Sequence, residues 1–118
     1  MKTRLLLVDD DHPLREMLRW ALEELGYRVT TASCCREALL AMHNGEYDFG
    51  LLDNHLPDGL GIELTQHLHR EHPSLPIVIY SGEAVELSRH DLGHLGVREI
   101  VAKPITAERL DSLFQSLL

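Results

Sequence analysis

Acidic and polar residues recur directly after short apolar runs in this chain. Three aspartates follow the first run, and a fourth aspartate, a serine and a lysine follow three later runs. These residues are Asp9, Asp10, Asp11, Asp53, Ser81 and Lys103. Carboxylates that lie close together repel one another unless a cation compensates them. A hard cation such as Mg²⁺ takes oxygen ligands from one or two carboxylates, waters and phosphate oxygens. The residue types therefore indicate Mg²⁺-assisted phosphoryl chemistry, if the fold brings the positions together.

Each residue type has a distinct use in such chemistry. A carboxylate beside a metal ion can act as a nucleophile and form an acyl phosphate, while the cation shields the charge of the incoming group. Lys103 could contact one phosphoryl oxygen as a point charge, and the Ser81 hydroxyl could donate to another. The alternative for the aspartate run is a set of acids that complement a helix dipole. That alternative applies best to Asp11, which stands nearest the expected helix start.

The elements that must position these residues are five strands alternating with five helices. Apolar runs predict strands at Arg4–Val8, Tyr27–Thr31, Phe49–Leu52, Ile77–Tyr80 and Glu99–Ala102. Apolar residues at helical spacing predict the helices between and after them. The last helix carries Leu110, Leu113, Phe114 and Leu117 on one face. The fourth helix, from Glu83 to His94, is the weakest because Gly93 and Gly96 interrupt its pattern.

Capping residues place the ends of the first helices. Asp11 is the expected N-cap of the first helix, and Gly26 is its expected stop. Ser33 is the expected cap of a second helix that runs to about His43. Residues 56–61 are rich in turn formers and predict a loop, and Pro73 ends the third helix.

Alternating strands and helices imply right-handed crossovers and a parallel sheet covered on both faces. The pattern therefore predicts a doubly wound α/β fold. In such sheets ligands bind beyond the carboxyl ends of the strands, where the polar residues stand. No linker or repeat divides the 118 residues, so one domain over positions 1–118 is expected.

Composition excludes several classes of protein. The formal net charge of −8 argues against direct nucleic-acid binding. No apolar stretch approaches the roughly 18 residues of a membrane span, and the run before Asp9 is too short for a signal peptide. Cys34 and Cys35 are adjacent and have no other cysteine to pair with. A cytosolic, reduced protein is the simplest interpretation.

Taken together, these motifs resemble the receiver domain of two-component response regulators over essentially the whole chain. The matching segments are Leu7-Val8-Asp9-Asp10, Leu51-Leu52-Asp53 with Pro57 and Gly61, Ser81-Gly82, and Gly96 followed by Lys103-Pro104. The resemblance implies a flavodoxin-like fold with five parallel strands in the order 2-1-3-4-5. It also implies a cytoplasmic signalling protein of bacterial type.

The resemblance assigns a role to each site residue. It implies that Asp53 is the phosphoacceptor and that Asp9, Asp10, Asp53 and the backbone carbonyl of His55 hold Mg²⁺. Ser81 would be the switch hydroxyl and Lys103 the phosphoryl-contacting lysine. The Lys103–Pro104 peptide bond would be cis.

One position departs from the family pattern. The family usually has Tyr or Phe three residues before the lysine, and here that residue is Ile100. A short side chain, stiff at its first torsion, lacks the ring's inward and outward swing. We expect phosphorylation to move residues Glu83 to His94 through Ser81 and the backbone alone. The departure favours a phosphorelay receiver or an unusual output surface.

The expected partners follow from the resemblance. A sensor histidine kinase would donate the phosphoryl group, and the face of helix 4, strand 5 and helix 5 would contact an effector domain or a second copy. The domain would phosphorylate itself and lose the group slowly, rather than turn over a substrate.

Three alternatives stay open. The chain is the receiver of a hybrid kinase or phosphorelay that passes phosphate to a histidine phosphotransfer protein, or the N-terminal receiver of a DNA-binding transcriptional regulator. The start at Met1, directly before the first strand, favours an N-terminal receiver. A metal-dependent phosphohydrolase would instead carry a second catalytic aspartate at position 55, which is His55 here.

Overall fold

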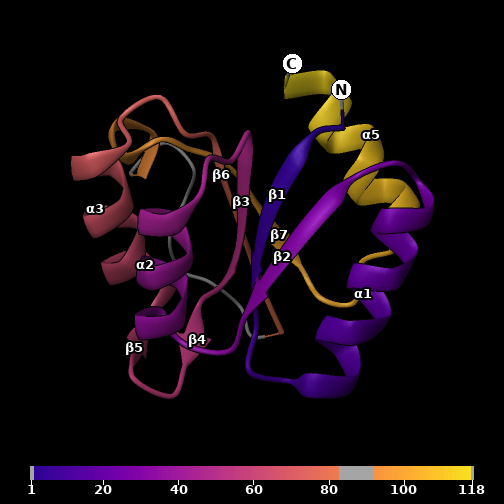
Figure 1. Ribbon diagram of the computed structural model, residues 1–118, viewed down its shortest axis with the longest axis horizontal. Coiled ribbons are helices and arrows are strands. Elements are labelled where there is room, and N and C mark those ends of the chain that lie inside the picture. Colours follow the sequence, from indigo (N-terminus) through magenta and orange to yellow (C-terminus); the bar gives the residue numbers. More distant parts are fainter. Residues whose placement is uncertain (1, 83–91, 118) are drawn as a thin grey trace.

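A five-stranded parallel sheet forms the centre of the computed structural model, which describes residues 2–82 and 92–117 (Figure 1). The strands lie in the order β2-β1-β3-β6-β7. Their bounds are β1 (Arg4–Val8), β2 (Arg28–Ala32), β3 (Phe49–Asp53), β6 (Ile77–Ser81) and β7 (Val97–Ala102). Counting the strands of this sheet alone, the order is 2-1-3-4-5. The predicted doubly wound, flavodoxin-like α/β fold is therefore confirmed.

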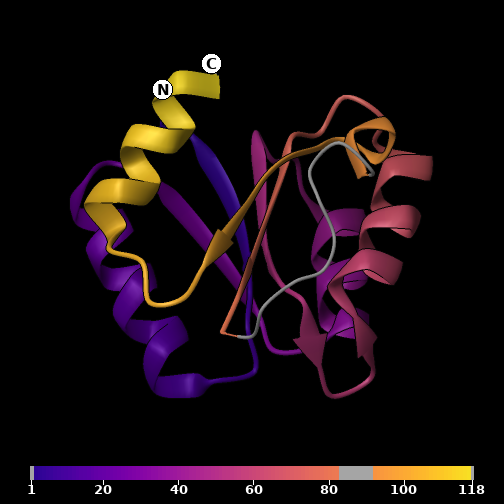
Figure 2. The same ribbon diagram turned by 180° about the vertical axis from the view of Figure 1, so that it is seen from behind.

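Helices cover both faces of the sheet. Helices α1 (His12–Glu24) and α5 (Ala107–Leu117) lie on one face, and α2 (Cys35–Asn44) and α3 (Gly61–Glu71) lie on the other (Figures 1 and 2). A short 3-10 turn, η1 (Gly93–Leu95), precedes β7. In the described part of the chain, none of the helices has the length and apolar run that crossing a bilayer requires.

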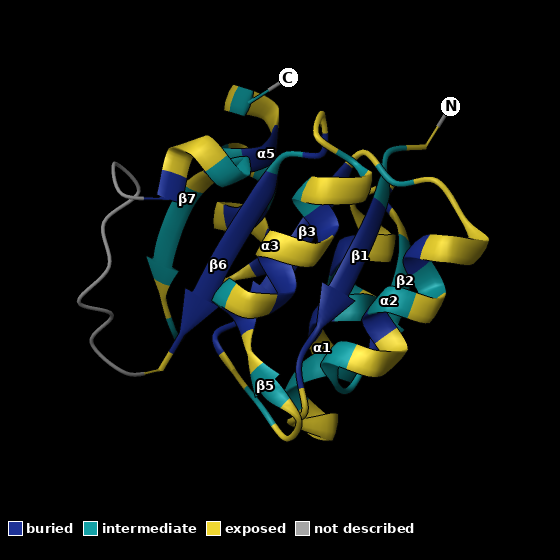
Figure 3. Cartoon of the chain, turned by 90° about the vertical axis from the view of Figure 1, so that its left-hand side faces the viewer, coloured by how far each residue is buried: buried dark blue, intermediate teal, exposed yellow. Residues whose placement is uncertain are grey.

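Two apolar layers hold the helices against the sheet, because alternate side chains of each strand point to opposite faces. Leu5 and Leu7 of β1 pack on the α1 and α5 side, while Leu6 and Val8 pack on the α2 and α3 side. Figure 3 shows the consequence: β1 and β6 are buried almost throughout, and the helices expose their outer faces. Because both faces of the sheet are packed against helices, the strands are held in place, and so are the polar residues at their carboxyl ends.

The first helix begins and ends as predicted. The Asp11 carboxylate accepts a hydrogen bond from the Leu14 backbone N–H at 3.2 Å, as an N-cap does. Gly26 follows the helix with a φ of 102°. This left-handed conformation costs glycine little.

Strands β2, β3 and β6 each end one residue later than predicted, and the starts of β2 and β7 also differ from the prediction. Strand β2 begins at Arg28 because Tyr27 packs edge-on against Phe114 and donates from its hydroxyl to Asp111. Tyr27 therefore lies in the connection between α1 and β2 and packs against α5. Strand β7 begins at Val97, two residues earlier than predicted, because Val97 is buried and pairs with Ile77.

The predicted Ser33 cap of the second helix is wrong. The N-cap position of α2 is Cys34, and its side chain makes no capping bond. The Asp58 carboxylate instead accepts from the backbone N–H groups of Cys35 and Arg36, at 2.7 and 3.0 Å. Ser33 donates to Glu37. The cap therefore comes from a segment more than twenty residues away, which a local sequence pattern cannot reveal.

The segment predicted as a plain loop after β3 contains two short strands. Strands β4 (His55–Leu56) and β5 (Gly59–Leu60) pair antiparallel in a hairpin whose turn carries Asp58. The hairpin thus links the end of β3 to the start of α2. The predicted helix from Glu83 to His94 lies, over residues 83–91, outside the described residues.

Candidate functional site

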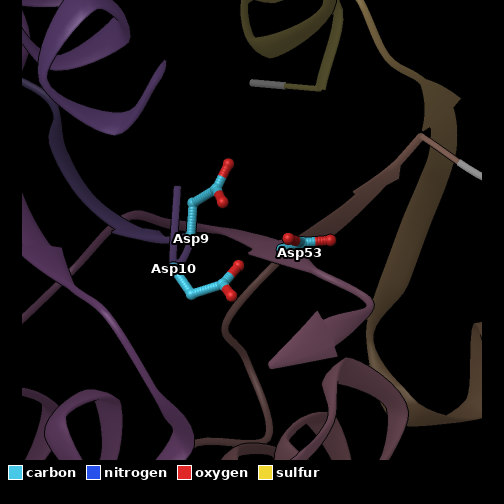
Figure 4. Close-up of side chains that lie close together, drawn as sticks. All are labelled: Asp9, Asp10 and Asp53. Carbon is cyan, nitrogen blue, oxygen red and sulfur yellow. The ribbon is translucent and has the colours of Figure 1, made fainter. Parts of the chain in front are cut away.

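Three carboxylates meet at the carboxyl end of the sheet. Asp9 and Asp10 follow β1, and Asp53 is the last residue of the adjacent β3. One carboxylate oxygen from each lies within 4.8 Å of the others, and Figure 4 shows the three side chains close together. Asp9 and Asp53 are buried, whereas Asp10 is exposed. Solvent therefore reaches the cluster from the Asp10 side, while Asp9 and Asp53 are shielded from it.

Lys103 supplies the positive charge of the site. Its Nζ lies 3.1 Å from Asp9 Oδ2 and 3.2 Å from Asp53 Oδ2, close enough to donate to both. The backbone positions this side chain, because the Lys103 N–H donates to the carbonyl of Ser81 at 2.8 Å. The Lys103–Pro104 peptide bond is cis. A single ammonium thus bridges two of the three carboxylates.

Backbone groups fix the position of Asp53. Its Oδ1 accepts from the His55 backbone N–H at 3.3 Å. The Gly61 N–H donates to the Asn54 carbonyl at 2.8 Å, which holds the start of α3 against the end of β3. A β-carbon added at Gly61 would lie 2.5 Å from the Asp53 carbonyl oxygen. Glycine is therefore required for this close approach.

Tyr80 is a site residue that sequence reasoning missed. It is fully buried, lies opposite Asp53 in the pairing of β6 with β3, and donates from its hydroxyl to Asp9 Oδ2. Its ring lies under Lys103, with Nζ 4.5 Å from the ring centroid. One signal could have found it. A tyrosine at the end of an otherwise apolar strand needs a polar partner for its hydroxyl.

Burial and charge act against one another in the ionisation of the site. Burial raises the pKa of Asp53, and the Lys103 charge opposes that rise without cancelling it. For Lys103, burial alone lowers the pKa, but hydrogen bonds and charges from Asp9 and Asp53 outweigh it and leave the pKa raised. Burial and the Asp9 carboxylate raise the pKa of Tyr80 far above its ordinary value. At neutral pH Lys103 is thus charged and Tyr80 is a hydroxyl donor.

The other predicted residues lie at the edge of the site or outside it. Ser81 is buried at the end of β6, the strand next to β3. His55 is exposed at the start of the hairpin. Ile100 pairs with Ile79 within the sheet and packs against the core on the α2 and α3 side, so it does not reach the carboxylates.

The donor set fits a hard divalent cation. Three carboxylates within 4.8 Å of one another offer oxygen ligands only, and one ammonium cannot neutralise all three. Asp10 is exposed, so waters can complete the coordination that a small cation demands. The residues present thus match the ligand preferences of Mg²⁺.

Comparison with known proteins agrees with this geometry. The family model described as the response regulator receiver domain matches residues 5–115. The chain is 31% identical to a probable transcriptional regulatory protein of Picosynechococcus, covering 99% of this chain and 49% of that protein. It is 29% identical to the phosphate regulon transcriptional regulatory protein PhoB of Escherichia coli, covering 100% of this chain and 52% of PhoB. The chain therefore spans about half the length of these curated relatives.

Solved structures give the same result. The response regulator TrrA of Thermotoga maritima, in complex with Mg²⁺–BeF, matches with a TM-score of 0.86 and 31% identity over 100% of both chains. A CheY-like receiver domain protein of Methanospirillum hungatei matches with a TM-score of 0.92 and 26% identity, covering 99% of this chain and 94% of that one. With its fold, its acidic cluster and its family match, this chain belongs to the response regulator receiver domains of two-component systems.

Proposed function

We propose that this chain accepts a phosphoryl group on Asp53 from a phosphohistidine of a sensor histidine kinase or a histidine phosphotransfer protein. The observation that carries the proposal is the placement of Asp53. Its carboxylate is buried at a strand end, 3.2 Å from the Lys103 ammonium and beside two further acids. A buried carboxylate facing a fixed cation is a nucleophile in a site built to receive an anionic group.

The transfer uses residues already in place. A carboxylate oxygen of Asp53 attacks phosphorus, the bond from phosphorus to the histidine nitrogen breaks, and its electron pair stays on the departing imidazole. Asp9, Asp10, Asp53 and the His55 carbonyl would hold Mg²⁺, which shields the negative charge of the phosphoryl group when bound. Lys103 would turn from the Asp53 carboxylate to a phosphoryl oxygen. Ser81, at the end of the neighbouring strand, would donate its hydroxyl to another.

The resulting acyl phosphate is a signal rather than a product that leaves. Water slowly hydrolyses the acyl phosphate, which restores the Asp53 carboxylate and releases inorganic phosphate. Until then the phosphoryl group changes the surface around β7 and α5. A cytoplasmic location is part of the proposal, since response regulators typically work there. The relative solved with Mg²⁺–BeF supports the proposed phosphoryl chemistry, because that complex holds both Mg²⁺ and a beryllium fluoride group on a response regulator.

Mass spectrometry with a variant of the nucleophile tests the proposal. Incubation with acetyl phosphate and MgCl₂ should add one phosphoryl mass to the wild type and none to Asp53→Asn. Asp48→Asn is the matched control, because Asp48 is exposed just before the amino end of β3, whereas the site lies at the carboxyl end. Full labelling of Asp53→Asn would contradict the assignment.

A second candidate concerns the whole protein. Curated relatives about twice as long as this chain are named as transcriptional regulatory proteins. This favours a receiver that controls a DNA-binding effector domain, whereas Ile100 favours a phosphorelay receiver. The length of the natural gene product distinguishes these. A DNA-binding module after Leu118 would support the first, and a preceding kinase core would support the second.

A further inference from the structure

The Asp9 carboxylate is more heavily hydrogen-bonded than a simple metal ligand needs to be. It is fully buried, and Oδ1 accepts from the Asp11 backbone N–H at 3.0 Å. Oδ2 accepts from both Lys103 and the Tyr80 hydroxyl. Each donor draws negative charge from the carboxylate that a cation would use, and the Tyr80 hydroxyl and the Lys103 ammonium share the same oxygen, Oδ2.

Of these donors, the Tyr80 hydroxyl does not follow from the resemblance to receiver domains. Lys103 and the aspartates belong to the matched motifs, whereas Tyr80 was recognised only in the structure. Among the residues that the structure describes, its side chain is the largest fully buried one, and it lies in the core shared by α1 and α5. The hydroxyl is therefore held at Asp9 by packing and cannot rotate away into solvent.

We propose that Tyr80 is a positioning residue that lowers the affinity of the site for Mg²⁺ by occupying a lone pair of Asp9 Oδ2. This inference deepens the proposed function and rests on it. The hydroxyl shares the charge of Asp9, so the cation depends more on Asp10 and Asp53. A weakly held cation exchanges readily between rounds of phosphorylation.

Removing the hydroxyl alone isolates this effect. In Tyr80→Phe the ring still fills the core and still lies under Lys103, while Asp9 keeps its bonds from Asp11 and Lys103. The carboxylate therefore stays in place, and one lone pair becomes available to the cation. We expect the Kd for Mg²⁺ to fall roughly three- to tenfold, the order of one lost hydrogen bond.

The structure offers a matched control in Tyr27. This tyrosine is also buried and also donates to a carboxylate, Asp111, at 2.6 Å. It lies just before β2, at the sheet edge opposite the site. Tyr27→Phe should lose the same kind of bond and leave the Kd for Mg²⁺ unchanged.

The experiment is a titration of the whole chain with MgCl₂ at neutral pH. The NMR signals of the Asp10 and Asp53 amides report Mg²⁺ binding at each step. A second NMR readout needs no metal: the Tyr80 hydroxyl proton, shielded from solvent, should give a slowly exchanging downfield signal that Tyr80→Phe lacks. Urea unfolding shows that each variant is folded. A merely structural role predicts an unchanged or weaker affinity, because a loosened site binds no better.

Tighter Mg²⁺ binding by Tyr80→Phe alone would support the inference. Equal or weaker binding than the wild type, or equal tightening by Tyr27→Phe, would overturn it and leave the proposed function intact. A wild type that binds no Mg²⁺ at millimolar concentration would overturn the inference and the proposed function together.

Discussion

Gly61 is the position where one added methyl group should disturb the site most directly. A β-carbon there would lie 2.5 Å from the carbonyl oxygen of Asp53, and real β-carbons essentially never approach within 3.0 Å. The obstructing atom belongs to the backbone of a buried strand, so no side chain can rotate away. Either β3 or the start of α3 must move by at least about 0.5 Å.

The expected cost of Gly61→Ala follows from two opposing effects. Overpacking of a buried site costs about 1–3 kcal/mol, and alanine recovers up to about 1 kcal/mol through its better helix propensity. We expect a net loss of about 1–2 kcal/mol in the free energy of unfolding. Because the shifted atom is in the phosphoacceptor residue, labelling by acetyl phosphate should also slow by about tenfold.

Gly50→Ala is the control on the same strand. Its added β-carbon would meet nothing closer than 3.8 Å, so unfolding should change by less than about 1 kcal/mol. Urea unfolding gives the stability of each variant, and mass spectrometry over time gives the labelling rate. Wild-type stability together with a wild-type labelling rate for Gly61→Ala would refute the reasoning.

Three further predictions concern the metal site, a helix cap and a buried phenol. Asp10→Ala should remove most Mg²⁺ binding, because Asp10 is the exposed ligand of the cluster, and a titration equal to the wild type would contradict this. Asp58 has a lowered pKa because two backbone N–H groups of α2 bind it, so the stability that it contributes should be lost as pH falls through that pKa. Acid unfolding of Asp58→Ala should lack this component. Burial raises the pKa of Tyr27 from 10.0 to about 12, so the stability that its protonated hydroxyl contributes should be present below pH 10 and lost towards pH 12. Tyr27→Phe should flatten urea-derived stability over that range, and an unchanged slope would count against it.

Much of the fold was predictable because its signals are local. Apolar runs marked all five strands of the sheet, and Asp11 and Gly26 marked the ends of α1. Strand ends also predicted that Asp9, Asp10, Asp53 and Lys103 meet, since parallel strands share one carboxyl edge.

The features that sequence reasoning missed depend on contacts across long stretches of chain. Asp58 caps α2 from the hairpin after β3, so Ser33 was the wrong choice although its type suits a cap. Tyr80 looked like one more apolar strand residue because its partner, Asp9, follows a different strand, β1. The close approach at Gly61 was equally invisible, since it depends on how tightly α3 docks on β3.

The ion pair between Lys103 and Asp9 joins residues 94 positions apart, which has a consequence for the newly made chain. The ribosome synthesises Asp9, Asp10 and Asp53 before it synthesises Lys103. Proteins are synthesised from the amino terminus at roughly 5–20 residues per second. Lys103 is therefore added several seconds after Asp9. During that interval a ribosome-bound fragment carries mutually repelling carboxylates without the Lys103 ammonium beside them. A truncated chain ending before Lys103 should therefore be poor at receiving a phosphoryl group, and signalling competence arrives only as synthesis of the domain nears completion.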